Sequence, residues 1–266
     1  MTIGEIYKFI DEIAPFKNQS GSDNSGLIVG DYTTKVKKIL VCLDVTNDIV
    51  SEAAKKSADL IIAHHPLMYR PISKISENDP LHALVRNNIS LIAVHTNIDV
   101  ASDGVSDLML KKLGFQKSSK AILPISDEGI GYGRIVELST PISAGELAEK
   151  SKKAFDCTIV KYVDSGKPIS KIGVSSGSAA ESVEAALEAG CDAFICGEVK
   201  YDRMLFAKDR GLTLIEAGHF HTEDIFCEDL VERLKQQFAD VTIEKATNSI
   251  DVCSYVISTN KLRSIL

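Results

Sequence analysis

Short apolar runs alternate with amphipathic segments along most of the chain. The first clear set is a run at Lys38–Asp44, a helical pattern at Asn47–Ser57 and a second run at Leu60–Ala63. Uninterrupted apolar runs of this length are typical of strands that are buried on both faces of a parallel sheet. Strands that alternate with helices predict an α/β fold with right-handed crossover connections.

The chain begins with a predicted amphipathic helix. Thr2 stands three residues before Glu5, which is the spacing of a capping box, and apolar residues recur at helical spacing from there to Ile13. A polar loop follows at Ser20–Gly26. Its backbone could cradle a phosphate, but it lacks the Gly-Lys-Ser/Thr ending of a P-loop, so we favour a plain turn.

The later part of the chain repeats the earlier pattern. When the sequence is displaced by 133 positions, Lys171–Val174 falls on Lys38–Val41, and the next helix and strand coincide without a gap. Ile89–Ile92 likewise corresponds to Leu212–Ile215, and Ser143–Leu147 corresponds to the opening helix. We predict two related α/β halves that arose by internal duplication, with mixed, largely parallel sheets. Chance similarity between short apolar runs is the alternative.

A polar turn at Ser126–Gly129 separates the halves, so we expect a first half at 1–127 and a second at 128–266. The last segment predicts a helix at about Glu223–Phe238 that could pack back on the first half. Strand-like runs follow at Val241–Ile243 and Val252–Ile257. If Glu223 opens its helix, the helix dipole favours the ionised form of its carboxylate.

Composition narrows the class of protein. Hydrophobic residues make up 44% of the chain and charged residues 25%, as in an ordinary globular protein. The net charge of -7 argues against general nucleic-acid binding. The six cysteines form no Cys-x-x-Cys pair, which excludes a zinc ribbon or dithiol motif. No signal pattern or membrane-length apolar run is visible, so we expect a cytoplasmic protein without a membrane partner.

Candidate chemistry gathers at the ends of predicted strands. His64 and His65 follow the strand Leu60–Ala63, and Pro66 ends it. Side chains alternate along an extended chain, so the two imidazoles point in different directions and could each serve one ion of a metal pair. The carboxyl ends of parallel strands are also where ligands bind. The alternative is a surface loop whose histidines meet only water.

Two further segments, His95–Asp99 and His219–Glu223, share the pattern His-x-x-x-carboxylate, and each follows an apolar run. Imidazole and carboxylate ligands together suit Zn, Mn and Fe(II), and a carboxylate can bridge two ions. We therefore expect the three strand ends to face one another across the interface of the two halves, with a dinuclear metal site between them. Asp103 and Asp107 fit better as residues that cap and open the next helix.

These segments together resemble the Nif-three-like dinuclear metal-centre family, also described as GTP cyclohydrolase I type 2 homologues. The resemblance spans essentially the whole chain, in a short form without an inserted central domain. It rests on five motifs in order, which are Asp23–Leu27, His64–Pro66, His95–Asp107, Gly197–Tyr201 and Gly218–Glu223.

The resemblance implies a set of metal ligands. His64 and Asp99 would bind one divalent ion, His65 and His219 would bind the other, and Glu223 would bridge them. Mixed histidine and carboxylate ligands accept Zn, Fe or Mn, so the sequence leaves the identity of the two ions in each subunit open.

His95 and His221 are candidate catalytic residues. Either could orient a ligand or carry protons, and a hydrogen-bonded structural histidine is the alternative for both.

Paired metal ions with open coordination positions suit hydrolysis. The resemblance implies a GTP cyclohydrolase, which opens the imidazole ring of guanine and releases formate. It also implies a homohexamer built as a trimer of dimers. The alternatives are a hydrolase of another nucleotide or phosphoester, and a regulatory or metal-chaperone assembly protein that binds metal without catalysis.

Overall fold

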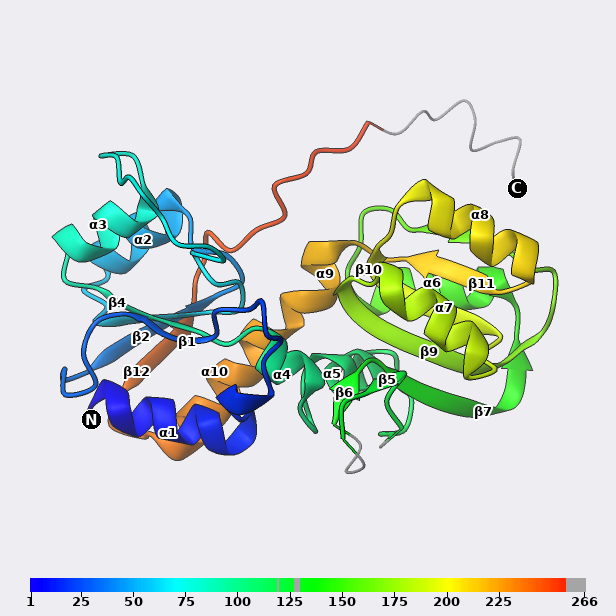
Figure 1. Ribbon diagram of the computed structural model, residues 1–266, viewed down its shortest axis with the longest axis horizontal. Helices are drawn as coiled ribbons and strands as arrows, with labels where there is room; N and C mark the ends of the chain where they lie inside the picture. The colour runs from blue at the N-terminus through cyan, green and yellow to red at the C-terminus, as the bar shows by residue number, and fades with distance from the viewer. Residues whose placement is uncertain (119, 127–129, 257–266) are drawn as a thin grey trace.

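Two α/β lobes lie side by side along the long axis of the molecule (Figure 1). The computed structural model describes residues 1–118, 120–126 and 130–256. The first sheet has the strand order β1-β4-β3-β2-β12, formed by β1 (Gly26–Val29), β4 (Ser90–Ala93), β3 (Leu60–Ala63), β2 (Lys38–Cys42) and β12 (Thr242–Lys245). The second has the order β7-β9-β10-β11-β8, formed by β7 (Arg134–Ile142), β9 (Ile169–Ser178), β10 (Ala193–Glu198), β11 (Thr213–Glu216) and β8 (Lys161–Val163).

Both sheets have a parallel centre. Strands β12, β2, β3 and β4 run parallel, and β1 pairs antiparallel with β4. Strands β9, β10 and β11 also run parallel, between the antiparallel edge strands β7 and β8. A short ribbon of β5 (Leu123–Pro124) and β6 (Gly131–Tyr132) completes the strands. The predicted α/β class with mixed, largely parallel sheets is confirmed.

Helices cover both faces of each sheet (Figure 1). The first lobe contains α1 (Ile3–Ile13), the short 3-10 helix Phe16–Asn18, α2 (Asn47–Lys55) and α3 (Pro80–Arg86). The second contains α6 (Ala144–Ala154), α7 (Ala180–Glu188) and α8 (Tyr201–Arg210). The remaining helices are α4 (Thr96–Val100), α5 (Val105–Lys112), α9 (His219–Glu223) and α10 (Ile225–Gln237). Among the described residues, none of the helices has the length and apolar character needed to cross a bilayer.

One hydrophobic core joins the lobes. Ile39 and Val41 of β2 belong to the same buried cluster as Ile195 of β10. The adjacent strand residues face the opposite side of each sheet. Leu40 packs under α2 and α3, and Phe194 packs under α7 and α8. Alternation along strands that are buried on both faces therefore produces a shared inner core and one outer core in each lobe.

The duplication is visible in the strand register. Ile39 pairs with Leu60 in the first sheet and Ile172 pairs with Ala193 in the second, which is the same register displaced by 133 positions. Asp59 accepts hydrogen bonds from two successive N–H groups at the start of β2, and Asp192 accepts two from successive N–H groups near the start of β9. Repeated pairing and repeated side-chain contacts support two related halves.

The C-terminal segment of the chain returns from the second lobe to the first. Strand β12 returns to the first sheet, where it pairs with Lys38–Val41, and α10 packs against β12 and β2. The predicted separating turn lies largely outside the described residues, since 127–129 are not among them. The division into 1–127 and 128–266 stays a prediction.

Two local predictions were wrong, and a third was right only in part. Residues 252–256 form no strand, and Val252 and Val256 are 88% and 103% exposed, so this apolar run pairs with neither sheet; Ile257 is outside the described residues. Glu223 ends α9 and precedes α10, so it does not open the long helix. Asp103 does not cap α5, whose N-cap is Gly104, but Asp107 lies in the first turn of α5 as expected and its carboxylate accepts a hydrogen bond from the N–H of Asp103.

Asp107 forms a buried ion pair that ties α5 to the second sheet. The guanidinium of Arg134 at the start of β7 is 1% exposed and lies 3.0 Å from the Asp107 carboxylate. Its other N–H groups donate to the carbonyls of Gly131, Gly133 and Ala101. The charge is therefore compensated on all sides, as a buried arginine requires.

We expect Asp107→Ala to lower the free energy of unfolding by about 3 to 5 kcal/mol, because it leaves a buried guanidinium without its counter-ion. Lys117→Ala, which breaks the exposed pair with Asp103, serves as the control and should cost less than about 1 kcal/mol. Urea unfolding measures both. Equal losses would contradict the role given to the pair.

Glu52 anchors the segment that follows β12. Burial opposes its ionisation, but hydrogen bonds from the N–H groups of Thr247 and Asn248 and from Lys56 outweigh burial and lower its pKa from 4.5 to about 2. A carboxylate with a depressed pKa stabilises the fold above its unfolded pKa, and this stabilisation is lost as the pH falls through the folded pKa.

We expect wild-type stability to decline between pH 4.5 and pH 2 by roughly 3 kcal/mol from this group alone. Glu52→Gln should be less stable at pH 7 and should lack that part of the decline, which unfolding curves at several pH values can measure. Glu12→Gln, at an exposed carboxylate, is the control. An unchanged acid profile for Glu52→Gln would refute this role.

Candidate metal centre

Strand ends from both lobes converge at one place. His64 and His65 follow β3, and their N–H groups continue the ladder by donating to the carbonyls of Cys42 and Leu43. His95 follows β4 and directly precedes α4, which carries Asp99. The short helix α9 follows β11 and carries the remaining ligand candidates, His219 and Glu223. Parallel strands place all these termini at adjoining sheet edges.

Glu223 lies at the centre of the cluster. Its Oε2 atom is 2.9 Å from His65 Nε2, 2.9 Å from His219 Nε2 and 3.8 Å from His64 Nε2. Asp99 Oδ1 lies 3.6 Å from His64 Nε2 on the other side. The structure thus brings together all five residues that the sequence proposed as metal ligands.

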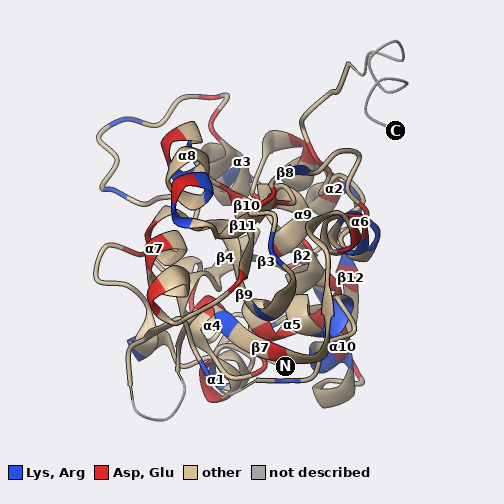
Figure 2. Cartoon of the chain, turned by 90° about the vertical axis from the view of Figure 1, so that its right-hand side faces the viewer, with Lys and Arg blue, Asp and Glu red and all other residues tan. Residues whose placement is uncertain are grey.

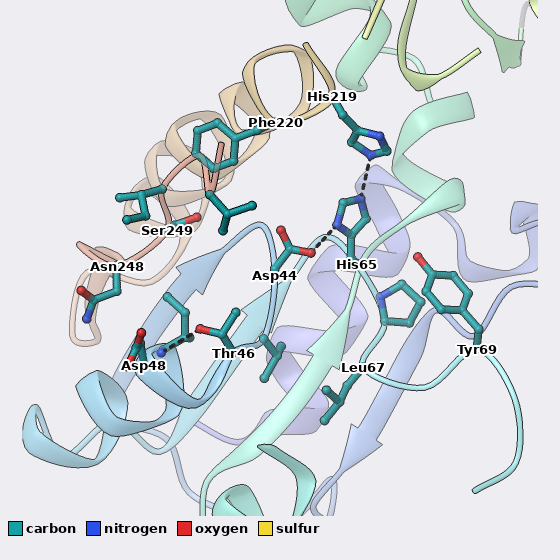
Figure 3. Close-up of a pocket in the computed structure, with 15 residues that line it drawn as sticks. Asp44, Thr46, Asp48, His65, Leu67, Tyr69, His219, Phe220, Asn248 and Ser249 are labelled. Atoms are coloured by element: carbon teal, nitrogen blue, oxygen red, sulfur yellow. Dashed lines mark hydrogen bonds and ion pairs between the residues drawn. The ribbon is translucent and has the colours of Figure 1, made fainter. Parts of the chain in front are cut away.

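Each imidazole of the cluster is oriented through its Nδ1 atom. His65 Nδ1 lies 2.7 Å from Asp44 and His219 Nδ1 lies 3.1 Å from Glu198 (Figure 3 shows His65 between Asp44 and His219). His64 Nδ1 lies 2.9 Å from the Val94 carbonyl. A hydrogen bond at Nδ1 fixes the tautomer and leaves Nε2 free to bind a cation.

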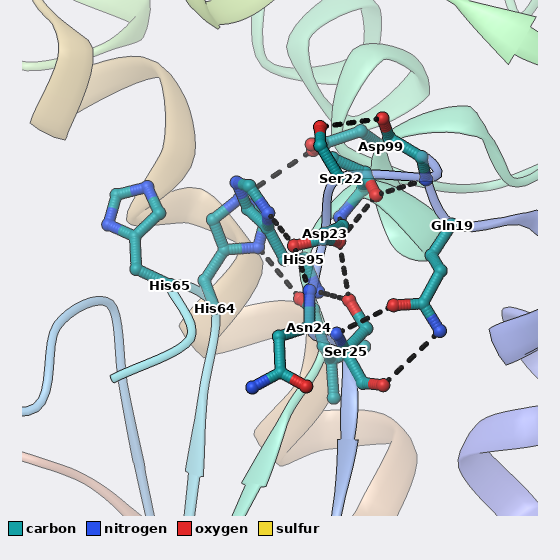
Figure 4. Close-up of polar contacts among 12 residues, drawn as sticks. Gln19, Ser22, Asp23, Asn24, Ser25, His64, His65, His95 and Asp99 are labelled. Carbon is teal, nitrogen blue, oxygen red and sulfur yellow. Dashed lines mark hydrogen bonds and ion pairs between the residues drawn. The ribbon is translucent and has the colours of Figure 1, made fainter. Parts of the chain in front are cut away.

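Three carboxylates that orient the imidazoles, Asp44, Glu198 and Asp23, were not predicted to be functional. The sequence positions of Asp44 and Glu198 could have indicated this role. Asp44 ends the predicted strand Lys38–Asp44, and Glu198 is the residue on which His65 falls when the halves are superposed. Asp23 comes from the polar loop that the sequence analysis treated as a plain turn, and it lies 2.8 Å from His95 Nδ1 (Figure 4).

Two buried polar atoms of the cluster have no hydrogen bond. They are His64 Nε2 and Asp99 Oδ1, and the residues are 0% and 13% exposed in their side chains. A buried donor or acceptor without a hydrogen-bond partner lowers the stability of the fold, so native proteins contain few such atoms. A cation would satisfy both atoms. Three overlapping groups of three residues each bring their donor atoms within 4.8 Å of one another, and they have the composition that divalent metals prefer.

The electrostatics of the cluster also suit cations. Burial and the charge of Glu223 raise the pKa of Asp99 well above its usual value. Burial likewise opposes ionisation of Glu223, but hydrogen bonds from His219 and His65 outweigh it and lower the pKa of Glu223. Two carboxylates this close repel each other, and a bound cation would remove that repulsion.

The histidines are perturbed in opposite directions. Burial lowers the pKa of His64 to about 3, so its imidazole is neutral and able to bind a metal. Burial also opposes protonation of His65, but hydrogen bonds to Asp44 and Glu223 outweigh it and raise the pKa to about 10. The hydrogen bond to Glu223 raises the pKa of His219 to about 9. A cation must therefore displace protons from these two residues.

His95 and His221 occupy different places. His95 belongs to the cluster, since one of its ring nitrogens lies within 4.8 Å of those of His64 and His65. His221 points away from the cluster and lies 3.3 Å from Asp251, without the geometry of a hydrogen bond. It lines a separate cavity beside Lys245. The catalytic roles suggested for both stay predictions, and the structure places only His95 where it can touch a bound ion.

Two cavities open on the cluster. A cavity of about 640 Å³ lies on the side of His65 and His219 and has largely apolar walls that include Leu67 and Phe220 (Figure 3). A second cavity of about 470 Å³ lies between the lobes and is lined by residues of the cluster, including Asp99 and Glu223.

The fold and the cluster define an α/β protein with two related halves and, at their interface, a group of histidines and carboxylates that could hold metal ions. Residues 1–252 match the family described as Duf34/NIF3 (NGG1p interacting factor 3). The chain belongs to this family, and the resemblance seen in the sequence is confirmed.

Relatives agree with this assignment. The chain is 33% identical over 231 residues to a Clostridium acetobutylicum protein named GTP cyclohydrolase 1 type 2 homolog. The aligned region covers 84% of this chain and 85% of that protein. It is 29% identical to a Helicobacter pylori protein named GTP cyclohydrolase 1 type 2, over 94% of this chain and 98% of that protein. A crystal structure of a Staphylococcus aureus hypothetical protein superposes with a TM-score of 0.89 at 26% identity, over 96% of this chain and 99% of that one.

We expect Gly177→Ala to weaken metal binding, because a Cβ atom at Gly177 would lie 2.0 Å from Glu223 Oε1 and displace this carboxylate. Gly166→Ala is the matched control, since Gly166 also has a positive φ but has nothing within 4 Å of the added atom. Elemental analysis after dialysis against a divalent metal measures the bound ions. Equal metal content in the two variants would contradict the position given to Glu223.

Proposed function

We propose that this chain is a hydrolase that depends on a pair of divalent metal ions. The observation that carries the proposal is the position of Glu223, whose carboxylate lies between imidazoles from both lobes beside the unpaired atoms of His64 and Asp99. Zn, Fe and Mn all suit such ligands.

The ligands divide naturally into two sets. His64 and Asp99 would hold one ion, His65 and His219 the other, and Glu223 would bridge them, with His95 beside the first set. When bound, two such ions supply Lewis acidity and activate water for attack on an electrophilic centre.

The chain's own residues prepare the site for this chemistry. Asp44 and Glu198 hold His65 and His219 with Nε2 toward the cluster. Tyr69 lines both cavities, and burial raises its pKa to about 12, so its hydroxyl stays protonated at neutral pH and can donate a hydrogen bond to a substrate. Ring contact between Tyr69 and His95 holds these two side chains together.

The substrate proposal is drawn from relatives. Proteins named GTP cyclohydrolase 1 type 2 and its homologs cover most of this chain. We infer that the chain takes a small molecule or nucleotide and that GTP is the first candidate. One water molecule would open the imidazole ring of guanine at C8, and a second would hydrolyse the resulting formamide to release formate. We further infer assembly as a homohexamer, a trimer of dimers, which light scattering of the purified protein can measure.

The test is formate release from GTP by the metal-loaded protein. We expect wild type to release formate, removal of metal to abolish it, and His65→Ala to lower the rate at least a hundredfold, since a ligand and an orienting contact are both lost. His82→Ala, at a histidine outside the cluster, is the control and should keep the wild-type rate.

Other results decide among the alternatives. No formate from wild type removes the GTP assignment. Failure with a broad panel of nucleotides and phosphoesters as well, together with ready loss of the ions to a weak chelator, would favour a metal chaperone or regulatory protein over a hydrolase.

A further inference from the structure

We propose that the cavity between the lobes binds a single oxyanionic group of the substrate, a phosphate or a carboxylate, at the N-terminus of α7. This inference rests on the proposed function, because the cavity opens on the metal cluster. It adds a substrate class that the ligand residues alone do not define.

The walls of this cavity come from two sources. The ligand candidates Asp99, His219 and Glu223 line one side, and the end of β9 with the first turn of α7 lines the other. A molecule in the cavity can therefore place a reactive centre at the cluster and a second group against α7.

The N-terminus of α7 is open to a ligand. The helix spans nine residues, Ala180–Glu188, and Ala179 at the N-cap has no side chain that could accept hydrogen bonds from the first-turn N–H groups. Uncapped N–H groups together with the positive end of the helix dipole attract anions. Both Ala179 and Ala180 line the cavity.

Three serine side chains that line the cavity provide an independent indication. Ser175, Ser176 and Ser182 line the cavity and are 7%, 9% and 4% exposed. Within the described part of the chain, none of their hydroxyls makes a hydrogen bond. These hydroxyls reach the cavity surface, where each can donate a hydrogen bond to an acceptor-rich group of a ligand.

Charge limits the ligand to one oxyanion. Of the described residues that line the cavity, none is Lys or Arg. Among the described lining residues, the exposed Glu181 is the only ionisable acid or base apart from the tyrosines, His95 and the ligand candidates, and α7 carries acidic side chains without basic ones (Figure 2). A polyphosphate would find no basic side chain to neutralise it. If GTP is the substrate, its triphosphate must lie outside this cavity.

The experiment is calorimetric titration of the metal-loaded full-length protein with inorganic phosphate and, in a second arm, with acetate. The arm that binds more tightly identifies the oxyanion. We expect Ser182→Ala and Ser175→Ala each to weaken binding about tenfold, because a hydrogen bond to a charged group is lost. Ser151→Ala is the matched control, since Ser151 is buried outside the cavity and already bonds to the Leu147 carbonyl.

Glu181→Gln provides a test that does not depend on removing a buried group. It removes a negative charge beside the proposed subsite, and we expect tighter phosphate binding by about threefold. Unfolding curves of every variant show that the fold is intact.

The outcomes separate the two proposals. Phosphate affinity that depends on metal but not on Ser175, Ser182 or Glu181 would mean that the anion binds the ions directly, and it would overturn the subsite. Serine-dependent binding in a protein that takes up no metal would overturn the proposed function and leave the subsite intact.

Discussion

The structure depends on one electrostatic constraint, which is the burial of ionisable donors from two lobes around a single carboxylate. Glu223 is 4% exposed and lies within 4 Å of three imidazoles, while Asp99 nearby has an oxygen without a partner. Such a cluster is costly unless cations share it. The rest of the chain accommodates this constraint through the strand ends that deliver the ligands, the outer acceptors that orient them and the glycine that makes room.

Much of the site could be predicted because sequence order and strand order agree in a parallel sheet. Residues that follow successive parallel strands of one sheet meet at its edge, which groups His64, His65 and Asp99 in the first lobe and places His219 and Glu223 at the edge of the second. The duplication predicted that the two edges face each other, and the family resemblance implied the set of five ligands. The acceptors Asp44 and Glu198 also stand at or just after the ends of parallel strands. They were passed over because acidic residues at strand ends are common and their target atoms lie in other segments.

The failures have physical causes of the same kind. Asp107 has the sequence position of a helix cap, and only the fold shows that its partner is Arg134, far along the chain. The run that includes Val252 has the composition of a strand, but an apolar run becomes a strand only where a sheet offers an unpaired edge. Local pattern therefore predicted elements well and predicted the partners of isolated charged residues poorly.

The shared inner core has a consequence for folding. Ile39 of one lobe and Ile195 of the other belong to one buried cluster, and the cluster of ligands draws on both lobes in the same way. Neither lobe can open without releasing whatever the ligands hold. Ions bound there would stabilise the joined lobes against unfolding, because only the folded chain presents the complete set of ligands.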